Sequence, residues 1–360
     1  MGCLWGLAWG DALGCPIEGW PAAEIASTFG GYPGLPTSYP QSISKKRRKR
    51  LRPLGIHSDD TQQALALISV CLTGWSAKAW GQCLVRGDTL KSWRGTGRHF
   101  DGAVEKLAKG GAPEAAGSPS AGIGAAMRIS PLGALYVDQS RRLAEVAIES
   151  SAVTHGDLRS IALGYAVAFA SARLVAGATA LQVRAELPDA VAEAEDEWLY
   201  ARTKWTFDRT GRHQLSLGLA RLFASMPEEI VPLGARVVAL AQPYLLPGFP
   251  AAHPNHGFAL LGGLYGLAAG LVVDVDPAAA LLAIVQQGED TDTVAAIAGG
   301  VLGARFGSGW VPKQRLIDAA KLELYAQALV TRKAPPESLE ALLLHEASLT
   351  VTEKAFQAQA

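Results

Sequence analysis

The sequence predicts an all-α fold, a compact globule built from many helices. Apolar residues make up 49% of the 360 residues and charged residues only 18%, and apolar side chains recur at helical spacing along most of the chain. Glycine, with 39 residues, and alanine are abundant, and such small side chains let helices approach closely. Alternating β-branched and aromatic residues, which would indicate strands, are scarce.

The predicted helices follow one another along the chain and are separated by loops rich in Gly, Pro and Ser. An apolar helix lies within residues 2–18 and is expected to end near Gly14, because a proline follows at position 16. A second helix is predicted from Thr61 to Trp75, where apolar residues recur every three or four positions. Loops are expected at 30–55, 110–124 and 242–257, and further helices at 140–153, 159–177, parts of 179–230, 257–273, 277–288 and 291–307.

We expect a single domain over residues 1–360, with a basic surface loop at 45–52 and an extreme C-terminus that need not be ordered. The formal net charge is zero, so no global field draws the chain to nucleic acid or to an anionic membrane. The apolar run 257–273 is short for a membrane span and rich in glycine, which favours a buried core helix. The four cysteines form no CxxC pair and no charged signal-peptide segment precedes them, so the expected location is cytoplasmic.

The basic segment KKRRKRLR carries seven cationic residues in the eight positions 45–52. Such a run is typical of a nuclear signal or an RNA-binding patch, and more often of a solvated, mobile loop. If the substrate is a modified macromolecule, this segment would steer its phosphates toward the protein.

Two acidic segments carry the strongest chemical signal, GIHSDDTQQALAL (55–67) and GEDTDTVAAIAGG (288–300). One interpretation is helix capping, because Ser58 and Asp290 are preferred N-cap residues and acidic side chains in the first turn complement the helix dipole. Capping does not require the second, adjacent carboxylate of the first segment, however. Neighbouring carboxylates also repel each other unless a cation or hydrogen-bond donors compensate.

The alternative interpretation is a metal site. Carboxylates and Ser/Thr hydroxyls are the hard oxygen ligands that Mg²⁺ and Mn²⁺ prefer. Each acidic segment offers three such groups within a few residues, and two sets of this size can hold two ions in a bridged centre. The two segments together therefore favour metal binding over two independent caps. The candidate ligands are Ser58, Asp59, Asp60, Asp290, Asp292 and Thr293.

Three further features are candidates for a functional site. Glu18 follows a helix break, where an acid is usually a turn residue, but near metals it would position water or share in coordination. His155, in THGD, is by itself more often a capping or core histidine than a functional one. The segment SAGIGAAMR (120–128) is similar to a glycine-rich phosphate loop that leads into a helix, although two glycines alone are weak evidence.

Five segments, spread over nearly the whole chain, occur in an informative order: GCLWGLAWGDALGCPIE (2–18), SDDTQQALAL (58–67), SAGIGAAMRISPLGAL (120–135), THGDLRSIALG (154–164) and GEDTDTVAAIAGGVLGARFG (288–307). In their residues and their order, these segments resemble the motifs of the ADP-ribosylglycohydrolase family, of the dinitrogenase-reductase-activating glycohydrolase type. The resemblance implies an all-α, orthogonal multi-helix fold with a centre of two Mg²⁺ or Mn²⁺ ions. It implies cleavage of the N- or O-glycosidic bond at ribose C1″ of an ADP-ribosylated protein or another ADP-ribosyl conjugate.

Residue by residue, the resemblance makes the six candidate ligands named above metal ligands. Glu18 matches the acid that contacts a metal or its water, and Glu18, Asp60 or Asp290 would handle the proton during hydrolysis. His155 matches a histidine that contacts the phosphate or ribose of ADP-ribose. The segment that wraps the diphosphate and ribose corresponds to Gly122, Gly124, Met127 and Arg128.

The chain departs from the family pattern at three positions. Ile123 stands where an Asn usually separates the two glycines, and Glu289 replaces a usual Gly beside the second acidic segment. Arg94 lies near the position of an acid proposed for catalysis in nitrogenase-regulating members. The ligand set is complete, so hydrolysis is still expected, whereas leaving-group preference and substrate pose are affected.

Two other protein classes compete with this interpretation. An all-α, Mg²⁺-dependent diphosphate enzyme of the terpene synthase kind would need DDxxD, but Gln63 occupies the last acidic position and aromatic residues reach only 7%. A non-catalytic relative that binds ADP-ribose would keep the fold, but such proteins often lose ligands, and this chain keeps them all. Arginine, serine, a nucleobase and an O-acetyl group remain candidate leaving groups.

Overall fold

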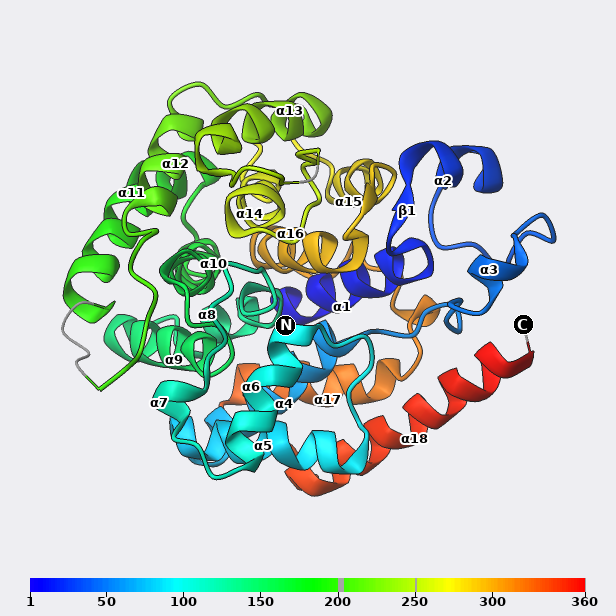
Figure 1. Cartoon of the computed structure of the whole chain (residues 1–360), viewed down its shortest axis with the longest axis horizontal. Helices are drawn as coiled ribbons and strands as arrows, with labels where there is room; N and C mark the ends of the chain where they lie inside the picture. The colour runs from blue at the N-terminus through cyan, green and yellow to red at the C-terminus, as the bar shows by residue number, and fades with distance from the viewer. Residues whose placement is uncertain (200–203, 250, 360) are drawn as a thin grey trace.

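Figure 1 shows that the described residues of the computed structural model, 1–199, 204–249 and 251–359, fold almost entirely into helices, which confirms the all-α class. The longer helices of the first half are α1 (Gly2–Gly14), α2 (Ala22–Phe29), α4 (Asp59–Gly74), α5 (Ala77–Leu90), α6 (Arg98–Ala108), α8 (Ser130–Leu135), α9 (Ser140–Ala152) and α10 (Leu158–Val175). Those of the second half are α11 (Ala180–Glu193), α12 (Gln214–Phe223), α13 (Ile230–Ala241), α14 (Leu264–Ala269), α15 (Pro277–Val285), α16 (Thr291–Phe306), α17 (Ala319–Thr331) and α18 (Leu339–Gln359).

The apolar helices α1 and α16 lie side by side, antiparallel, at the centre of the molecule (Figure 1). Glycines recur every four residues on α1, at positions 2, 6, 10 and 14, and therefore share one face. A Cβ at Gly6 would lie 2.0 Å from the carbonyl oxygen of Gly299, and one at Gly10 would lie 2.0 Å from that of Ala295. Glycine is thus required for the two backbones to come this close. The contact brings the end of α1 to the start of α16.

We expect Gly6→Ala to destabilise the protein by about 3 kcal/mol or more, because the new methyl group would overlap a backbone carbonyl and not a movable side chain. Chemical denaturation measures the change. Gly309→Ala is the control, since a Cβ there meets nothing within 4 Å, and its free energy of unfolding should stay within about 0.5 kcal/mol of the wild-type value. Equal effects of the two substitutions would contradict the close helix contact.

The other helices surround this central pair. In Figure 1, α4, α5 and α17 lie below it and α12 to α14 above it. Helix α10 packs against α8, α9 and α16. Among the described residues it is the one helix long and apolar enough to span a membrane, but 72% of that stretch is buried inside the protein. Burial of this kind is what a core helix shows.

Four segments differ in detail from the sequence expectation. Strands β1 (Trp20–Pro21) and β2 (Gly288–Glu289) form a two-residue antiparallel ladder, too short to leave an alternating pattern in the sequence. Within the expected loop 30–55, the first basic residues form the short helix α3 (Lys45–Arg48). The apolar run 257–273 contains a π-helix at Ala259–Gly263 followed by α14, so it is not one straight helix. At the C-terminus, α18 continues to Gln359.

Candidate metal centre

A cavity of about 920 Å³ opens where the residues after α1, the starts of α4 and α16, and the glycine-rich segment converge. Most of the predicted site residues line it, namely Glu18, Asp59, Asp60, Gly122, Gly124, Met127, His155, Asp290, Asp292 and Thr293. Ser58 and Arg128 do not line the cavity and are buried behind its wall. The fold thus brings the two acidic segments to one place.

The N-terminus of α4 is capped from another helix. The carboxylate of Asp11, on α1, accepts two hydrogen bonds from the amide of Ser58 (2.9 and 3.0 Å), one from the amide of Thr61 (3.1 Å) and one from the Thr61 hydroxyl (2.6 Å). Ser58 Oγ accepts a hydrogen bond from the amide of Asp60 at 3.2 Å. These bonds satisfy amides that a helix start leaves free. Asp59 and Asp60 are therefore not required as caps.

The carboxylates of Asp59 and Asp60 have different surroundings. Asp59 Oδ2 accepts a hydrogen bond from Gln63 Nε2 at 2.7 Å, one turn further along α4. Asp60 is 2% exposed, and its Oδ2 has no hydrogen-bond partner among the described residues. A buried carboxylate oxygen without a donor is rare and costly. A cation in the cavity would satisfy it.

The second acidic segment is anchored to the end of α1. The hydroxyl of Thr291 donates to the carbonyl oxygen of Gly14 at 2.9 Å, so the first turn of α16 is fixed beside the end of α1. Asp290 occupies the N-cap position, and Asp292 Oδ1 accepts from the amide of Thr293 at 3.0 Å. Both aspartates line the cavity.

Crowding raises the pKa values of these carboxylates. Burial, and then the charge of a neighbouring aspartate, raises the pKa of Asp59 from 3.8 to about 8. Burial, and then the charge of Glu18, raises the pKa of Asp290 to about 6. Burial and surrounding carboxylates also hold the pKa values of Asp60 and Asp292 well above their usual range. Divalent cations offset such repulsion, and this oxygen-rich donor set fits Mg²⁺ or Mn²⁺.

One thiol belongs to the same cluster. Cys15 Sγ donates to Asp11 Oδ1 at 3.0 Å, and single ligand atoms of Asp11, Cys15 and Asp292 all lie within 4.8 Å of one another. Burial raises the pKa of the Cys15 thiol well above its usual value, so it is neutral at physiological pH. Because Asp11 already accepts several hydrogen bonds, we assign it to positioning α4 and not to metal ligation.

Glu18 lies on the cavity wall just after a 3₁₀ turn, Cys15–Ile17, and its side chain is 42% exposed. Arg52 Nη2 donates to Glu18 Oε2 at 3.1 Å. This arginine ends the basic segment but is buried, and Arg47 also turns inward, to Glu24 at 2.6 Å. The segment is therefore only partly the basic surface loop that was expected. Its exposed cations are Lys45, Lys46, Lys49 and Arg50.

The glycine-rich segment packs against the ring of His155. A Cβ at Gly124 would lie 3.1 Å from His155 Cε1, and one at Gly122 would lie 3.5 Å from His155 Nε2. His155 Nδ1 is hydrogen-bonded to Thr154 Oγ1 at 2.9 Å, which leaves Nε2 free for a ligand. Burial, and then the charge of Arg128, lowers the pKa of His155 to about 3. The imidazole is therefore neutral at neutral pH.

Arg128 was expected to touch substrate, but it lies behind the glycine-rich segment. Its guanidinium donates to the carbonyl oxygen of Gly124 (3.2 Å) and to Thr154 Oγ1 (2.7 Å), and it also donates to Gln63 Oε1. Gln63 in turn holds Asp59. Arg128 thus joins the glycine-rich segment to the first acidic segment from inside the protein.

The three departures from the family pattern have distinct surroundings. Ile123 is 3% exposed and packs into the hydrophobic core. Glu289 has a φ of +63°, a left-handed conformation that glycine adopts more readily. Arg94 does not line the cavity; it forms a buried ion pair with Glu346 at 2.7 Å. The position expected near a catalytic acid therefore carries a structural ion pair in this chain.

Sequence reasoning missed Asp11, Gln63 and Arg52 as parts of the site. Asp11 had a usable signal, because it is the one charged residue in the apolar helix α1. In the sequence Gln63 is a departure from DDxxD, but its position one turn after Asp59 also places the two side chains on one face. Arg52 gave no local signal, since its partner Glu18 is 34 residues away.

The fold and the cavity define an all-α protein with a buried acidic centre whose oxygen donors fit hard divalent cations. The chain belongs to the ADP-ribosylglycohydrolase family, whose profile matches residues 1–338. It is 25% identical over 334 residues to an uncharacterized protein of Archaeoglobus fulgidus, covering 92% of this chain and 94% of that protein. It is 26% identical over 232 residues to the uncharacterized protein YegU of Escherichia coli, covering 61% of this chain and 66% of YegU.

The fold is also similar to a solved structure, described as an ADP-ribosylglycohydrolase-related protein complex. The TM-score is 0.59 at 24% sequence identity, and the similarity covers 92% of this chain and 96% of that one. At this identity the likeness bears on the fold alone.

Proposed function

We propose that the chain is a hydrolase that depends on two divalent cations, Mg²⁺ or Mn²⁺, and releases ADP-ribose from a modified protein or another ADP-ribosyl conjugate by cleaving the bond at C1″. The observation that carries this proposal is the convergence of four aspartates from two distant segments on one cavity, with Asp60 Oδ2 left without a partner among the described residues. The cavity of about 920 Å³ is at the large end of ligand pockets, as a dinucleotide-sized substrate requires.

The two acidic segments would hold the cations. Ser58 Oγ accepts a hydrogen bond from the amide of Asp60 and would coordinate through its remaining lone pair, and Thr293 supplies a second hydroxyl at the cavity wall. When bound, the cations would polarise substrate oxygens and lower the pKa of water. The proposed ligands are Ser58, Asp59, Asp60, Asp290, Asp292 and Thr293.

Glu18 is the favoured group for holding the attacking water and taking its proton. It lines the cavity, is partly exposed, and is oriented by the bond from Arg52. Asp60 and Asp290, which line the same cavity, are the alternatives. Loss of the leaving group develops positive charge at C1″, and the adjacent carboxylates would stabilise that charge.

The glycine-rich segment and His155 form the proposed substrate-binding wall. Gly122 and Gly124 line the cavity and, because they carry no Cβ, leave room for the His155 ring beside them. The backbone of this segment is proposed to contact the diphosphate, and Met127 lines the same wall. The neutral imidazole of His155 can hydrogen-bond a ribose or phosphate oxygen through Nε2. The exposed cations of the basic segment, Lys45, Lys46, Lys49 and Arg50, are proposed to steer phosphates toward the cavity.

The direct test is release of ADP-ribose from labelled ADP-ribosyl-arginine, followed by a panel of serine-, nucleobase- and O-acetyl-linked substrates. We expect release with Mg²⁺ or Mn²⁺, loss of release in EDTA, and recovery when either cation is restored. Calorimetry with ADP-ribose and Mg²⁺ is the companion measurement. Binding of ADP-ribose without release from any substrate would identify a non-catalytic binder, and release that persists in EDTA would contradict the metal requirement.

A further inference from the structure

Helix α18 lies outside the residues 1–338 matched by the family and packs along α4 and α5 (Figure 1). Its inner face buries Leu342 and Leu343, as expected for a helix that packs on a core. The same face also buries two carboxylates, Glu346 at 1% and Glu353 at 7% exposure. Buried carboxylates are costly unless they are fully paired. Their partners therefore indicate what the helix does.

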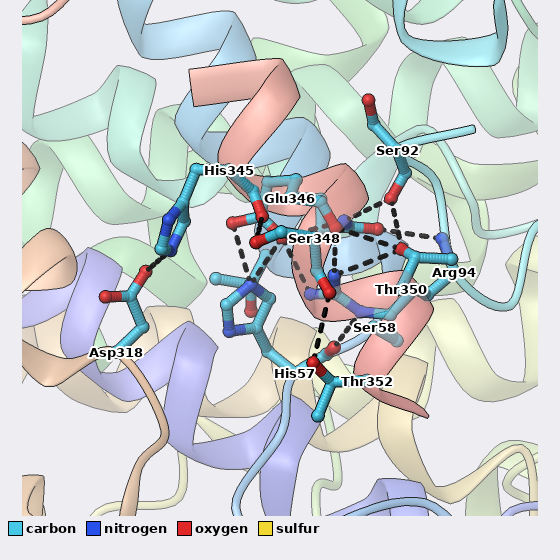
Figure 2. A network of polar contacts seen from close by, with 12 residues as sticks. His57, Ser58, Ser92, Arg94, Asp318, His345, Glu346, Ser348, Thr350 and Thr352 are labelled. Atoms are coloured by element: carbon cyan, nitrogen blue, oxygen red, sulfur yellow. Dashed lines mark hydrogen bonds and ion pairs between the residues drawn. The ribbon is translucent and has the colours of Figure 1, made fainter. Parts of the chain in front are cut away.

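Glu346 is the centre of a buried polar network, which Figure 2 shows from close by. It accepts hydrogen bonds from Arg94 Nη2 at 2.7 Å and from Gln62 Nε2 at 2.8 Å, and His57 Nε2 lies 3.3 Å from both of its oxygens. Arg94 Nη1 also donates to the backbone carbonyl oxygen of Glu346 at 3.0 Å. Arg94 thus binds Glu346 at both its carboxylate and its backbone carbonyl oxygen.

This network holds the backbone on both sides of Ser58. Arg94 Nε donates to the carbonyl oxygen of His57 at 3.1 Å, and the carbonyl oxygen of Arg94 accepts from the amide of Asp59 at 2.8 Å. Gln62, on α4, also belongs to this network, because its Oε1 accepts a hydrogen bond from the amide of Arg94 at 2.8 Å. Contacts that end on α18 therefore act together with those of Asp11 in fixing the backbone from which Asp59 and Asp60 project.

The second buried carboxylate of α18, that of Glu353, is linked through Arg52 to Glu18 on the cavity wall. Glu353 Oε1 lies 3.2 Å from Arg52 Nε, and the other end of the same guanidinium donates to Glu18 Oε2 at 3.1 Å. Thr350, between the two glutamates, donates to the carbonyl oxygen of Ser92 at 2.8 Å and so ties down the loop that carries Arg94. One helix thus supports both the first acidic segment and Glu18.

We propose that α18 is a positioning element of the candidate metal centre, with Glu346 as the positioning residue for the segment Ser58–Asp60 and Glu353 as the positioning residue for Glu18. Neither glutamate lines the cavity, so both act through an arginine. The expected effect of α18 on metal binding rests on the proposed function. Its expected effect on the backbone around Ser58 rests only on the contacts described above.

The test compares Glu346→Gln with Glu340→Gln, on the same helix. Glu340 pairs with Arg86, but both side chains are nearly half exposed, so the control removes an ion pair of α18 without touching the network. For Glu346→Gln we expect about tenfold weaker Mn²⁺ binding by calorimetry, the size of effect typical of groups that support metal ligands. We also expect faster hydrogen exchange in residues 56–61. The control should match the wild type in both measurements.

A purely structural role of Glu346 predicts a different result. It would lower the melting temperature and raise exchange throughout α4 and α18, with Mn²⁺ affinity within about twofold of wild type, and that outcome overturns the proposal. If Glu346→Gln does not fold, the double variant Arg94→Met/Glu346→Met replaces the pair by apolar side chains of similar length, which buried pairs often tolerate. The same two results are expected for it, because the bond to the His57 carbonyl oxygen is lost.

Failure of the proposed function is separable from failure of this inference. If the wild-type chain binds no Mn²⁺, the metal requirement is wrong, while local exchange in residues 56–61 still decides whether Glu346 positions that segment. If the wild type binds Mn²⁺ and Glu346→Gln changes neither affinity nor exchange, the metal centre stands and the positioning role of α18 is refuted.

Discussion

Replacing Asp60 with asparagine is expected to reduce release of ADP-ribose at least about a thousandfold while making the metal-free protein more stable. The loss follows because the side chain gives up the charge that holds a cation, and polarisation by a bound cation lowers the activation barrier by several kcal/mol. The gain follows because Asp60 is buried among other carboxylates, which raise its pKa well above the usual range. An amide carries no charge and can donate to those neighbours.

The two effects are measured separately. Release is assayed at saturating Mn²⁺, and unfolding is measured with denaturant in EDTA near pH 8, where we expect the variant to gain about 1 to 3 kcal/mol. Asp138→Asn is the matched control, because Asp138 is exposed and pairs only at the surface with Arg332, so both quantities should stay close to wild type. Release by Asp60→Asn at near-wild-type rates would remove Asp60 from the proposed centre, and Asp290→Ala provides the same check for the second segment.

The opposite signs of the two effects distinguish a metal ligand from a structural aspartate. Asp11 is the useful contrast within the same cluster. Its carboxylate accepts hydrogen bonds from Ser58 and Thr61, so its replacement would release the start of α4 and destabilise the protein. Asp60 has no such donor on Oδ2 among the described residues. Neutralising a metal ligand such as Asp60 should stabilise the metal-free protein, whereas neutralising a capping residue such as Asp11 should destabilise it.

The sequence was sufficient to predict features that depend on local residue patterns. Helical spacing indicated the all-α class, and the break at Pro16 located the end of α1 within a residue or two. The paired aspartates stood out because adjacent like charges need an explanation wherever they fold. In the structure, Asp59, Asp60, Asp290 and Asp292 do line one cavity.

The sequence was insufficient for contacts between distant segments. The position of Arg94 in the chain is near that of an acid proposed for catalysis in the family, but its partner, Glu346, comes 252 residues later. Arg128 lies in a motif expected to touch substrate, yet its bonds run inward to Gln63 and Thr154. Whether a charged side chain faces a cavity or the core depends on the segment packed behind it. Local sequence patterns do not predict that orientation.

The acidic cluster also predicts how the metal-free protein responds to pH. In the unfolded chain an aspartate has a pKa of 3.8, but in the folded chain the pKa of Asp59 is about 8 and that of Asp290 about 6. Below about pH 4 these groups are protonated in both states and cost nothing. As the pH rises from about 4 to 8, the unfolded chain ionises first, so the folded state either retains its protons or accepts buried charge. Stability in EDTA should therefore fall across this range, by several kcal/mol, since each unit of pKa displacement is worth about 1.4 kcal/mol.

Divalent cations should offset part of this loss, because they bind the ionised carboxylates of the folded state only. With Mn²⁺ at about 100 times its dissociation constant, the folded state gains about 2.7 kcal/mol, and more as higher pH frees the ligands of protons. The measurement is denaturant unfolding at pH 5, 6.5 and 8, in EDTA and in Mn²⁺. Asp59→Asn is the internal control, because it removes the group whose pKa rises to about 8 and should flatten the EDTA profile. A wild-type profile in EDTA that is level between pH 5 and 8, or that Asp59→Asn leaves unchanged, would show that the carboxylates are not crowded as the fold places them.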